Sequence, residues 1–179
     1  MLPMKPPGDI PPYELPEDKL LAQCRFEAFT SSGPGGQRRN RSYAAVRITH
    51  LPTGISASAT DSRSQRENRI HAIRALRHKL ALELRREIEI DPISYHPPPW
   101  FAEYPKLHMS PKNPLYPATI AIVLDVLKAA HWNVPAAASL LRLSSSALIR
   151  FLGDDGQLWA TVNRHRSELG MAPLTKRER

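Results

Sequence analysis

The stretch AAVRITHLPTGISASAT, Ala44 to Thr60, decides the fold of the first half of the chain. Two runs of β-branched and small residues, 44–50 and 55–60, are separated by the letters LPTG. Proline and glycine between two such runs favour a tight turn, so the stretch predicts a β-hairpin. Upstream, residues 25–30 alternate as a strand does, and residues 17–22 predict a short helical turn.

Directly after the hairpin, the period of the apolar residues becomes that of a helix. One long helix is predicted from Ser62 to about Glu89, with Asp61 or Ser62 capping its first turn. The predicted apolar stripe of this helix consists of Ile70, Ile73, Leu76, Leu80 and Leu84. The other faces carry Arg63, Arg66, Arg69, Arg74, Arg77, Lys79, Arg85 and Arg86. The helix should therefore pack its stripe on the hairpin and show the solvent a largely basic surface.

Between the first strand and the hairpin lies SSGPGGQRRNR, Ser31 to Arg41. Its three glycines permit positive φ and a close approach of the backbone to a ligand. Gln37 adds a backbone donor and a side-chain amide, and the arginines after it can hold phosphates. Composition alone leaves another interpretation open, a flexible Arg and Gly segment that binds RNA loosely or only joins a strand to the hairpin.

The second half of the chain predicts only helices. Their expected ranges are 118–132, 136–141, 145–152 and 157–169. Pro135 falls in the first turn of the second helix, where proline is well tolerated. The turn Gly153-Asp154-Asp155-Gly156 should end the two short helices before the last one begins.

Proline clusters mark the domain organisation, since proline removes a backbone donor and restricts its predecessor. Six prolines lie in the first sixteen residues, and eight lie from Pro92 to Pro117. The predicted fold class is α+β, a small antiparallel sheet with a long basic helix, followed by a separate small all-α domain. The predicted parts are a proline-rich N-terminal extension (1–15), the α+β domain (16–90), a proline-rich linker (91–117), the helical domain (118–174) and a basic tail (175–179).

Composition favours a nucleic-acid partner. A net charge of +8 over 179 residues indicates a polyanionic ligand, although a basic surface without a special role is the alternative. No apolar run approaches the ~20 residues of a membrane span, and the N-terminus lacks the apolar core of a signal peptide. The single cysteine, Cys24, indicates a reducing compartment, and the seven histidines show no ligand spacing. We therefore expect a cytoplasmic, soluble monomer without a metal site or cofactor.

Residues 30–69 resemble the catalytic domain of class I peptide chain release factors, above all the stand-alone YaeJ-type members that rescue stalled ribosomes. The resemblance extends over roughly residues 15 to 90 and is carried, in chain order, by SSGPGGQ (31–37), Asn40, AVRITHLPTG (45–54), and SRSQ (62–65) with Asn68. Two places depart from the family pattern. Arg38 and Arg39 follow the glutamine where relatives usually carry His and Val, and Arg66 and Glu67 stand where relatives often carry His or Lys.

This resemblance implies hydrolysis of the ester of peptidyl-tRNA in the peptidyl transferase centre of the ribosome. The tip, Gly35-Gly36-Gln37, would enter that centre, where the backbone amide of Gln37 stabilises the oxyanion and its side chain shapes the water site. The implied partners are the ribosome, its RNA and peptidyl-tRNA. The residues implied to contact RNA are Arg38, Arg39, Asn40, Arg41, Arg63, Ser64, Gln65, Arg66, Asn68 and Arg69.

Only about thirty residues precede the loop, so we expect no stop-codon reader and codon-independent action. Residues 91–179 hold ten Lys and Arg against seven Asp and Glu, which differs from the basic tail of YaeJ-type proteins. The run HWNVPAAASLLRLSSSALIRFL, 131–152, resembles the helix-turn-helix of Fis-type proteins. Two roles for 118–174 stay open: a helical bundle that touches ribosomal protein or RNA, and a nucleic-acid reader. The alternative function is a non-catalytic RNA- or DNA-binding protein with a vestigial Gly-Gly-Gln loop.

Overall fold

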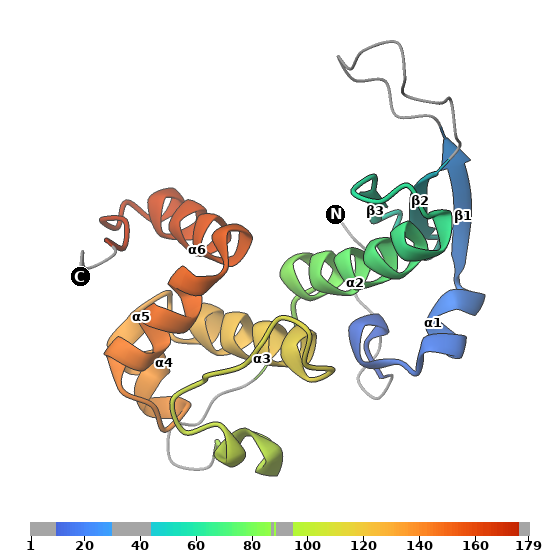
Figure 1. Ribbon diagram of the computed structural model, residues 1–179. Helices are drawn as coiled ribbons and strands as arrows, with labels where there is room; N and C mark the ends of the chain where they lie inside the picture. The colour runs from blue at the N-terminus through green and yellow to red at the C-terminus, as the bar shows by residue number, and fades with distance from the viewer. Residues whose placement is uncertain (1–9, 30–43, 87, 89–94, 176–179) are drawn as a thin grey trace. The chain divides into compact units, whose positions relative to one another are not determined.

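A computed structural model describes residues 10–29, 44–86, 88 and 95–175 (Figure 1). The chain divides into two compact units, Met1–Glu83 and Leu84–Arg179. The predicted fold class is confirmed, because the first unit holds a three-stranded antiparallel sheet with one long helix and the second is helical. The elements are η1 (Pro12–Glu14), α1 (Glu17–Ala22), β1 (Cys24–Phe29), β2 (Ala45–His50), β3 (Ser56–Ala59), α2 (Gln65–Glu83), η2 (Pro99–Glu103), α3 (Tyr116–Ala129), α4 (Val134–Leu140), α5 (Ser145–Asp154) and α6 (Gly156–Glu168).

The sheet has the order β1-β2-β3, and both neighbouring pairs are antiparallel. The predicted hairpin is confirmed between β2 and β3. Gly54, at φ 71°, closes its turn by donating its N–H to the carbonyl of His50 at 2.8 Å. Positive φ is a conformation that glycine adopts without steric cost, which explains its place in LPTG.

Helix α2 packs across one face of this sheet, mainly on β2 and β3 (Figure 1). Ile48 of β2 and Leu76 and Leu80 of α2 are fully buried between them. Alternate residues of a strand point to opposite faces, so the neighbours of Ile48 in β2 face away from the helix. One sheet face thus forms the core of the first unit, and the other carries exposed residues such as Arg47 and Ser58.

The long helix is shorter than the sequence predicts. It begins at Gln65, and Ser64 caps it by accepting the N–H of Glu67 at 3.3 Å, so the predicted caps Asp61 and Ser62 were wrong. It ends at Glu83, six residues before its predicted end, where the first unit ends. Apolar periodicity continues past that point because Leu84 begins the second unit rather than another turn of α2.

The predicted apolar stripe needs the same correction. Ile73, Leu76 and Leu80 are buried as expected, whereas Ile70 is 43% exposed. The buried positions of the first turns are taken by Asn68 and Ala72, each 0% exposed. Spacings of four residues from 68 to 80 therefore define the buried face, and one of its members is polar.

The basic surface of α2 is also smaller than predicted. Arg77 is half-buried, and its guanidinium donates to the carbonyls of Tyr13 and Leu15 at 3.2 and 2.7 Å, which holds η1 against the helix. Lys79 donates to the carbonyl of Ser56 at 3.0 Å. Long basic side chains can pack along apolar surface in this way. Arg63, Arg66, Arg69 and Arg74 are exposed.

His50, the first letter of HLPTG, is a structural clamp and only 1% exposed. Its Nε2 lies 2.9 Å from Gln23 Oε1, and its Nδ1 lies 2.8 Å from Thr53 Oγ1. The amide oxygen of Gln23 can only accept, so Nε2 is the donor of that hydrogen bond. The imidazole therefore joins the start of β1 to the hairpin turn.

His50→Ala should lower the free energy of unfolding of the first unit by about 2 kcal/mol, because Gln23 and Thr53 lose their buried partner. Denaturant unfolding followed by hydrogen exchange of β2 measures this. A matched control is His131→Ala, which removes an exposed histidine of the second unit. Equal effects of the two substitutions would contradict the clamp.

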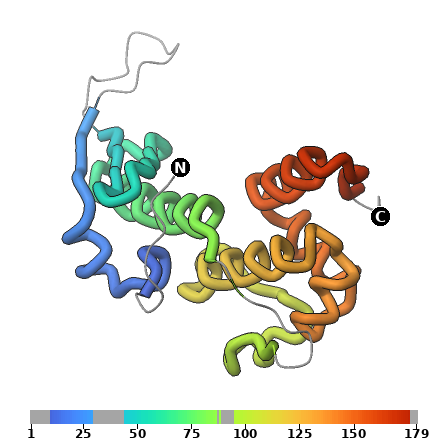
Figure 2. Tube along the Cα trace, turned by 180° about the vertical axis from the view of Figure 1, so that it is seen from behind, coloured from blue at the N-terminus to red at the C-terminus, as the bar shows by residue number. Residues whose placement is uncertain are grey.

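In the second unit, α4 packs on α3, α5 on α4 and α6 on α5 (Figure 2). The predicted helices are all present, within a few residues at each end. Asn133 caps α4 by accepting the N–H of Ala136 at 3.0 Å, and proline stands in the first turn as predicted. The predicted four-residue turn after α5 is instead a single residue, because α5 runs to Asp154 and α6 starts at Gly156.

That single residue, Asp155, joins three helices. Its Oδ1 accepts the N–H groups of Gln157 and Leu158 at 2.9 and 3.0 Å, which caps α6. Its Oδ2 accepts the hydroxyl of Tyr116, at the start of α3, at 2.9 Å. Burial, together with the charge of Asp155, raises the pKa of Tyr116 well above its usual value, so this phenol stays a donor.

The proline-rich segment before α3 contributes side chains to the second unit. Phe101 of η2 and Leu107 are each 3% exposed. The segment that follows α2 is anchored to α3, where Arg85 Nη1 lies 2.9 Å from Asp125 Oδ1. Burial raises the pKa of Asp125, and the positive charge of Arg85 opposes that shift. Among the described residues, no helix is both long and apolar enough to span a bilayer.

Candidate functional site at the base of the loop

The predicted site residues fall into two groups. Gly35, Gly36, Gln37, Arg38, Arg39, Asn40 and Arg41 lie in 30–43, outside the described residues. The structure places the other six at or just before the start of α2: Arg63, Ser64, Gln65, Arg66, Asn68 and Arg69. It also describes the base from which the loop departs, so the site can be built from that base.

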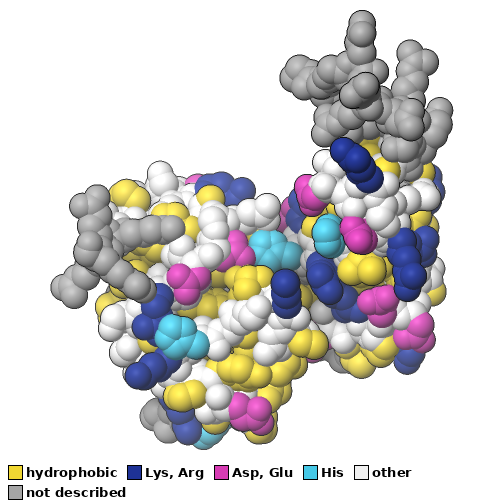
Figure 3. Space-filling model, in the orientation of Figure 1, with side chains coloured by type: hydrophobic (Ala, Val, Ile, Leu, Met, Phe, Trp, Pro, Cys, Tyr) yellow, Lys and Arg dark blue, Asp and Glu magenta, His cyan; other side chains and the backbone are white. Residues whose placement is uncertain are grey.

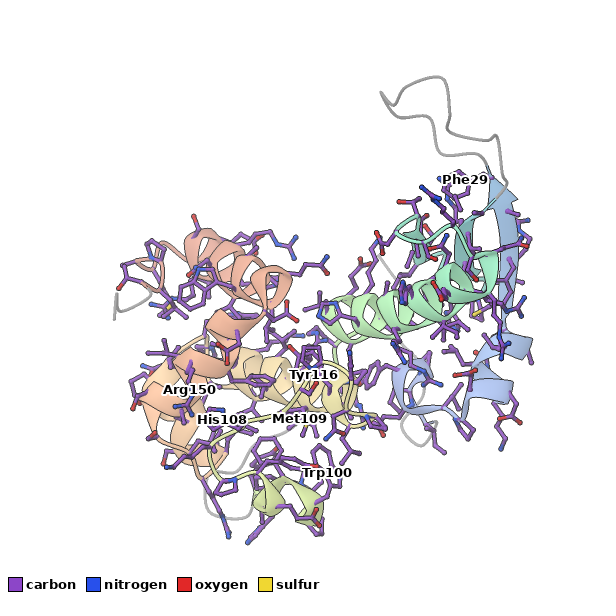
Figure 4. All side chains as sticks on the ribbon, in the orientation of Figure 1. Phe29, Trp100, His108, Met109, Tyr116 and Arg150 are labelled. Carbon is purple, nitrogen blue, oxygen red and sulfur yellow. The ribbon has the colours of Figure 1, made fainter. Side chains whose placement is uncertain are left out.

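The base of the loop is a pair of facing strand ends. Phe29, the last residue of β1, pairs with Ala45, the first residue of β2. Figure 4 shows Phe29 at the loop end of its strand. Because the two residues are held in antiparallel register, the chain leaves and re-enters the sheet at adjacent positions.

Asn68 ties the returning end of the loop to α2. Its Nδ2 donates to the carbonyls of Ala44 and Ser62, each at 2.7 Å, and its Oδ1 accepts the N–H of Ser62 at 2.9 Å. The amide thus makes three hydrogen bonds at a site that is 0% exposed. Among the described residues expected to contact RNA, Asn68 is the one that the fold hides from solvent.

The residues SRSQ, 62–65, form the N-terminal cap and the start of α2. Ser64 Oγ accepts the N–H of Glu67, and Ser62 Oγ accepts the N–H of Ser64 at 3.0 Å. Ser62 Oγ in turn donates to the Glu67 carboxylate. A Ser followed three residues later by Glu is the pattern of a capping box, and here the glutamate reaches Ser62. The two serines are therefore occupied by the helix start, and Gln65 is exposed beside them.

The arginines around the cap differ in their surroundings. Arg63 and Arg66 are exposed, with no hydrogen bond or ion pair to any part of the chain that the structure describes. Arg69 is also exposed, but its guanidinium carbon lies 3.7 Å from the ring centroid of Phe26 in β1. In Figure 3, the basic side chains of the first unit (dark blue) are interspersed with acidic ones (magenta).

The sequence reasoning missed a second arginine of this kind. Arg47 of β2 makes a cation–π contact with Phe29, with 5.3 Å from guanidinium carbon to ring centroid. Its Nε donates to Ser58 Oγ at 3.4 Å. The signal was present in the alternation of β2, which places Arg47 on the sheet face opposite the buried Ile48. The start of α2 carries several arginines, whereas Arg47 is the single arginine of β2.

Cys24, the single cysteine of the chain, is the first residue of β1, at the end opposite the loop. Burial raises the pKa of this thiol, and the charge of Arg77 opposes the shift. Burial also lowers the pKa of Arg77, while Glu17 and Cys24 raise it. Within the described ranges, no group of three or more His, Cys, Asp or Glu side chains could hold a metal ion.

The family model described as RF-1 domain matches residues 17–92. Peptide chain release factor 1 of Exiguobacterium sibiricum is 49% identical over 63 residues, which are 35% of this chain and 18% of that protein. The N-terminal part of the chain is therefore homologous to the RF-1 domain of peptide chain release factors. Its β1, its hairpin and α2 are the elements described above, and the Gly-Gly-Gln letters fall inside the match.

The RF-1 domain is homologous to both bacterial release factors. Peptide chain release factor 2 of Acidothermus cellulolyticus is 49% identical over 76 residues, 42% of this chain and 19% of that protein. Peptide chain release factor 1 of Bifidobacterium longum is 52% identical over 56 residues, 31% of this chain and 16% of that protein. The chain thus spans about a fifth of the length of the curated relatives it matches.

Outside the RF-1 domain, α5 is the helix that the Fis-type resemblance assigns to DNA reading. Ala147, Leu148, Phe151 and Leu152 of α5 are buried. Arg150, its one basic residue, donates from Nη2 to the carbonyl of Lys106 at 2.9 Å (Figure 4). A recognition helix needs several exposed polar side chains to reach base edges. Ser146 and Asp154 are the exposed residues of α5, so this helix offers little to a groove.

Proposed function

We propose that the chain hydrolyses the ester of peptidyl-tRNA in the ribosomal peptidyl transferase centre without reading a codon. The supporting observation is the RF-1 domain itself, in which the letters Gly35-Gly36-Gln37 are inserted between the paired strand ends Phe29 and Ala45. In this proposal the ribosome supplies the RNA site and the loop supplies an amide at its tip. Gly35 and Gly36 allow the backbone to approach without a Cβ in the way.

The proposed reaction is attack of water on the ester carbonyl carbon. The carbonyl oxygen becomes an oxyanion, to which the backbone N–H of Gln37 donates, and the Gln37 side chain orients the water. The bond from the acyl carbon to the ribose oxygen then breaks, the ribose oxygen takes a proton, and the peptide leaves as a carboxylic acid. A preorganised donor of this kind contributes about 3–4 kcal/mol to lowering the barrier.

The proposed rescue of stalled ribosomes depends on the residues outside the RF-1 domain. The curated relatives match only the RF-1 domain, and 84–179 form a separate helical unit without a strongly basic composition. We propose the organisation 1–15, 16–90, 91–117, 118–174 and 175–179, a monomer in the cytoplasm, and a second ribosomal contact through 118–174. The burial of α5 favours a bundle that docks on ribosomal protein or RNA over a helix-turn-helix that reads a groove.

The RNA-contacting residues of the proposal are those of the loop together with the exposed start of α2. Arg38, Arg39, Asn40 and Arg41 would hold phosphates around the tip. Arg63, Arg66, Arg69 and Gln65 are exposed and suited to direct contact, whereas Ser64 and Asn68 would position them from within the fold.

Release of labelled peptide from purified bacterial ribosomes tests this function. We expect equal release from ribosomes stalled on messages that place no codon, a sense codon or a stop codon in the decoding site. A release factor 1 control should act only on the stop codon. Release by this chain on the stop codon alone would contradict codon-independent rescue. Ribosome binding without any release would favour the non-catalytic alternative.

A further inference from the structure

Two arginines lie on opposite faces of the strand that leads into the loop. Phe26 and Phe29 are three residues apart in β1, so their rings point to opposite faces of the sheet. Arg69 covers Phe26 from the α2 side, at 3.7 Å, and Arg47 covers Phe29 from the outer side, at 5.3 Å. The base of the loop is thus flanked on each side by a guanidinium in cation–π contact with a ring.

The contact with the ring determines which N–H groups of each guanidinium remain available for a ligand. A guanidinium in a cation–π contact with an aromatic ring keeps its remaining N–H groups available for a phosphate. The ring also limits side-chain rotamers, which lowers the entropy that binding would cost. Both arginines are exposed, and the terminal nitrogens of Arg47 have no hydrogen bond to any other described residue.

The acidic neighbour of Arg47 does not neutralise it. Glu27 stands directly opposite Arg47 in the register of β1 and β2, but its carboxylate pairs with Arg25 at 3.2 Å. Arg25 and Glu27 cancel each other, and Arg47 remains the uncompensated charge among the described residues of the outer face. Ser56 and Ser58 of β3 and Thr49 complete this face with neutral side chains.

We infer that Arg47 and Arg69 are two phosphate-binding positions that grip RNA backbone on both sides of the loop base. The partner, ribosomal RNA, rests on the proposed function, while the positions rest on the stacked geometry. The outer face of the sheet thereby becomes a second RNA surface, separate from the start of α2.

The test is the salt dependence of binding to purified bacterial 70S ribosomes, measured for wild type, Arg47→Ala, Arg69→Ala and the double variant. Each lost phosphate contact should lower the slope of log affinity against log salt by about one unit and weaken binding roughly tenfold. The double variant should lose about two units, because the sites lie on opposite faces and act independently. Phe29→Leu keeps every charge, so it should weaken binding a few-fold with an unchanged slope.

Two control variants distinguish the loss of a phosphate-binding position from a general loss of positive charge. Lys19→Ala removes one exposed positive charge from α1, beyond the other end of β1, and should leave the slope unchanged. Arg25→Ala combined with Glu27→Ala removes the neutral ion pair of the outer face and should do the same. A slope equal to that of wild type in both arginine variants, with a lowered melting temperature, would show that the stacks only stabilise the fold.

The outcomes for the function and for the surface are distinguishable. Reduced salt slopes without any peptide release by wild type would leave the RNA surface standing and remove the hydrolase. Peptide release by all variants with unchanged slopes would overturn the surface and leave the hydrolase standing. A wild type that does not bind ribosomes would overturn both.

Discussion

Gln37→Ala is expected to lower the single-turnover rate of peptide release by about 10²-fold, with ribosome binding retained. In the proposed mechanism the glutamine side chain orients the attacking water, and alanine leaves that water unheld. Gln37→Pro goes further, because proline also lacks the backbone N–H that would bind the oxyanion, and it should lose about 10²- to 10³-fold more. Rapid mixing with preformed, stalled ribosomes measures the rate, and pelleting measures the binding.

Gln157→Ala is the matched control for this substitution. It truncates the same side chain at an exposed position in the first turn of α6, outside the RF-1 domain, and should release peptide at the wild-type rate. Wild-type release by Gln37→Ala would show that the side chain has no part in the reaction. Wild-type release by Gln37→Pro would remove the loop from the mechanism altogether.

Asn68→Ala is expected to cause the second large effect, a loss of about 3 kcal/mol in the free energy of unfolding of the first unit. Alanine leaves the carbonyls of Ala44 and Ser62 and the N–H of Ser62 without the amide that satisfies them. Asn68 is 0% exposed, so water does not take its place without opening the helix start. Hydrogen exchange of β2 and α2 should therefore accelerate about 10²-fold.

The position of the tryptophans supplies an internal control. Trp100, Trp132 and Trp159 all belong to the second unit, so tryptophan fluorescence reports unfolding of that unit, whereas hydrogen exchange of β2 and α2 reports the first. Asn163→Ala is the matched variant, since that half-buried amide accepts one hydrogen bond, from the N–H of Leu174 at 2.7 Å. It should cost about 1 kcal/mol or less, and only in the second unit. Equal losses of unfolding free energy in the two variants would mean that the burial of Asn68 makes no additional contribution to stability.

Local sequence patterns predicted much of the fold because each pattern depends on interactions between neighbouring residues. The turn chemistry of LPTG, the alternation of β1 and the period of α2 each describe a few neighbouring residues, and all three elements are present. The end of α2 was less predictable, because Leu84 continues the apolar period although the chain has already entered the second unit. Helix boundaries of this kind depend on tertiary context rather than on propensity.

The site was predictable in its residue types and not in their partners. An asparagine at position 68 is compatible both with RNA contact and with a hydrogen bond to the carbonyl of Ala44. Only the fold shows that these two residues, 24 apart in the sequence, meet. Likewise, the role proposed for Arg69 and Arg47 depends on their contacts with the rings of Phe26 and Phe29. Such pairings join strand to helix and strand to strand, so no window along the sequence contains both partners.

The hydrogen bond from Asn68 to Ala44 also orders events during synthesis. The chain is made from the N-terminus, so β1, the glycine loop and the hairpin leave the ribosome before the residue that fixes the base of that loop. Until Asn68 emerges and the first turn of α2 forms, the carbonyl of Ala44 lacks its partner. A nascent chain therefore completes the base of the loop only after the start of the helix has left the ribosome.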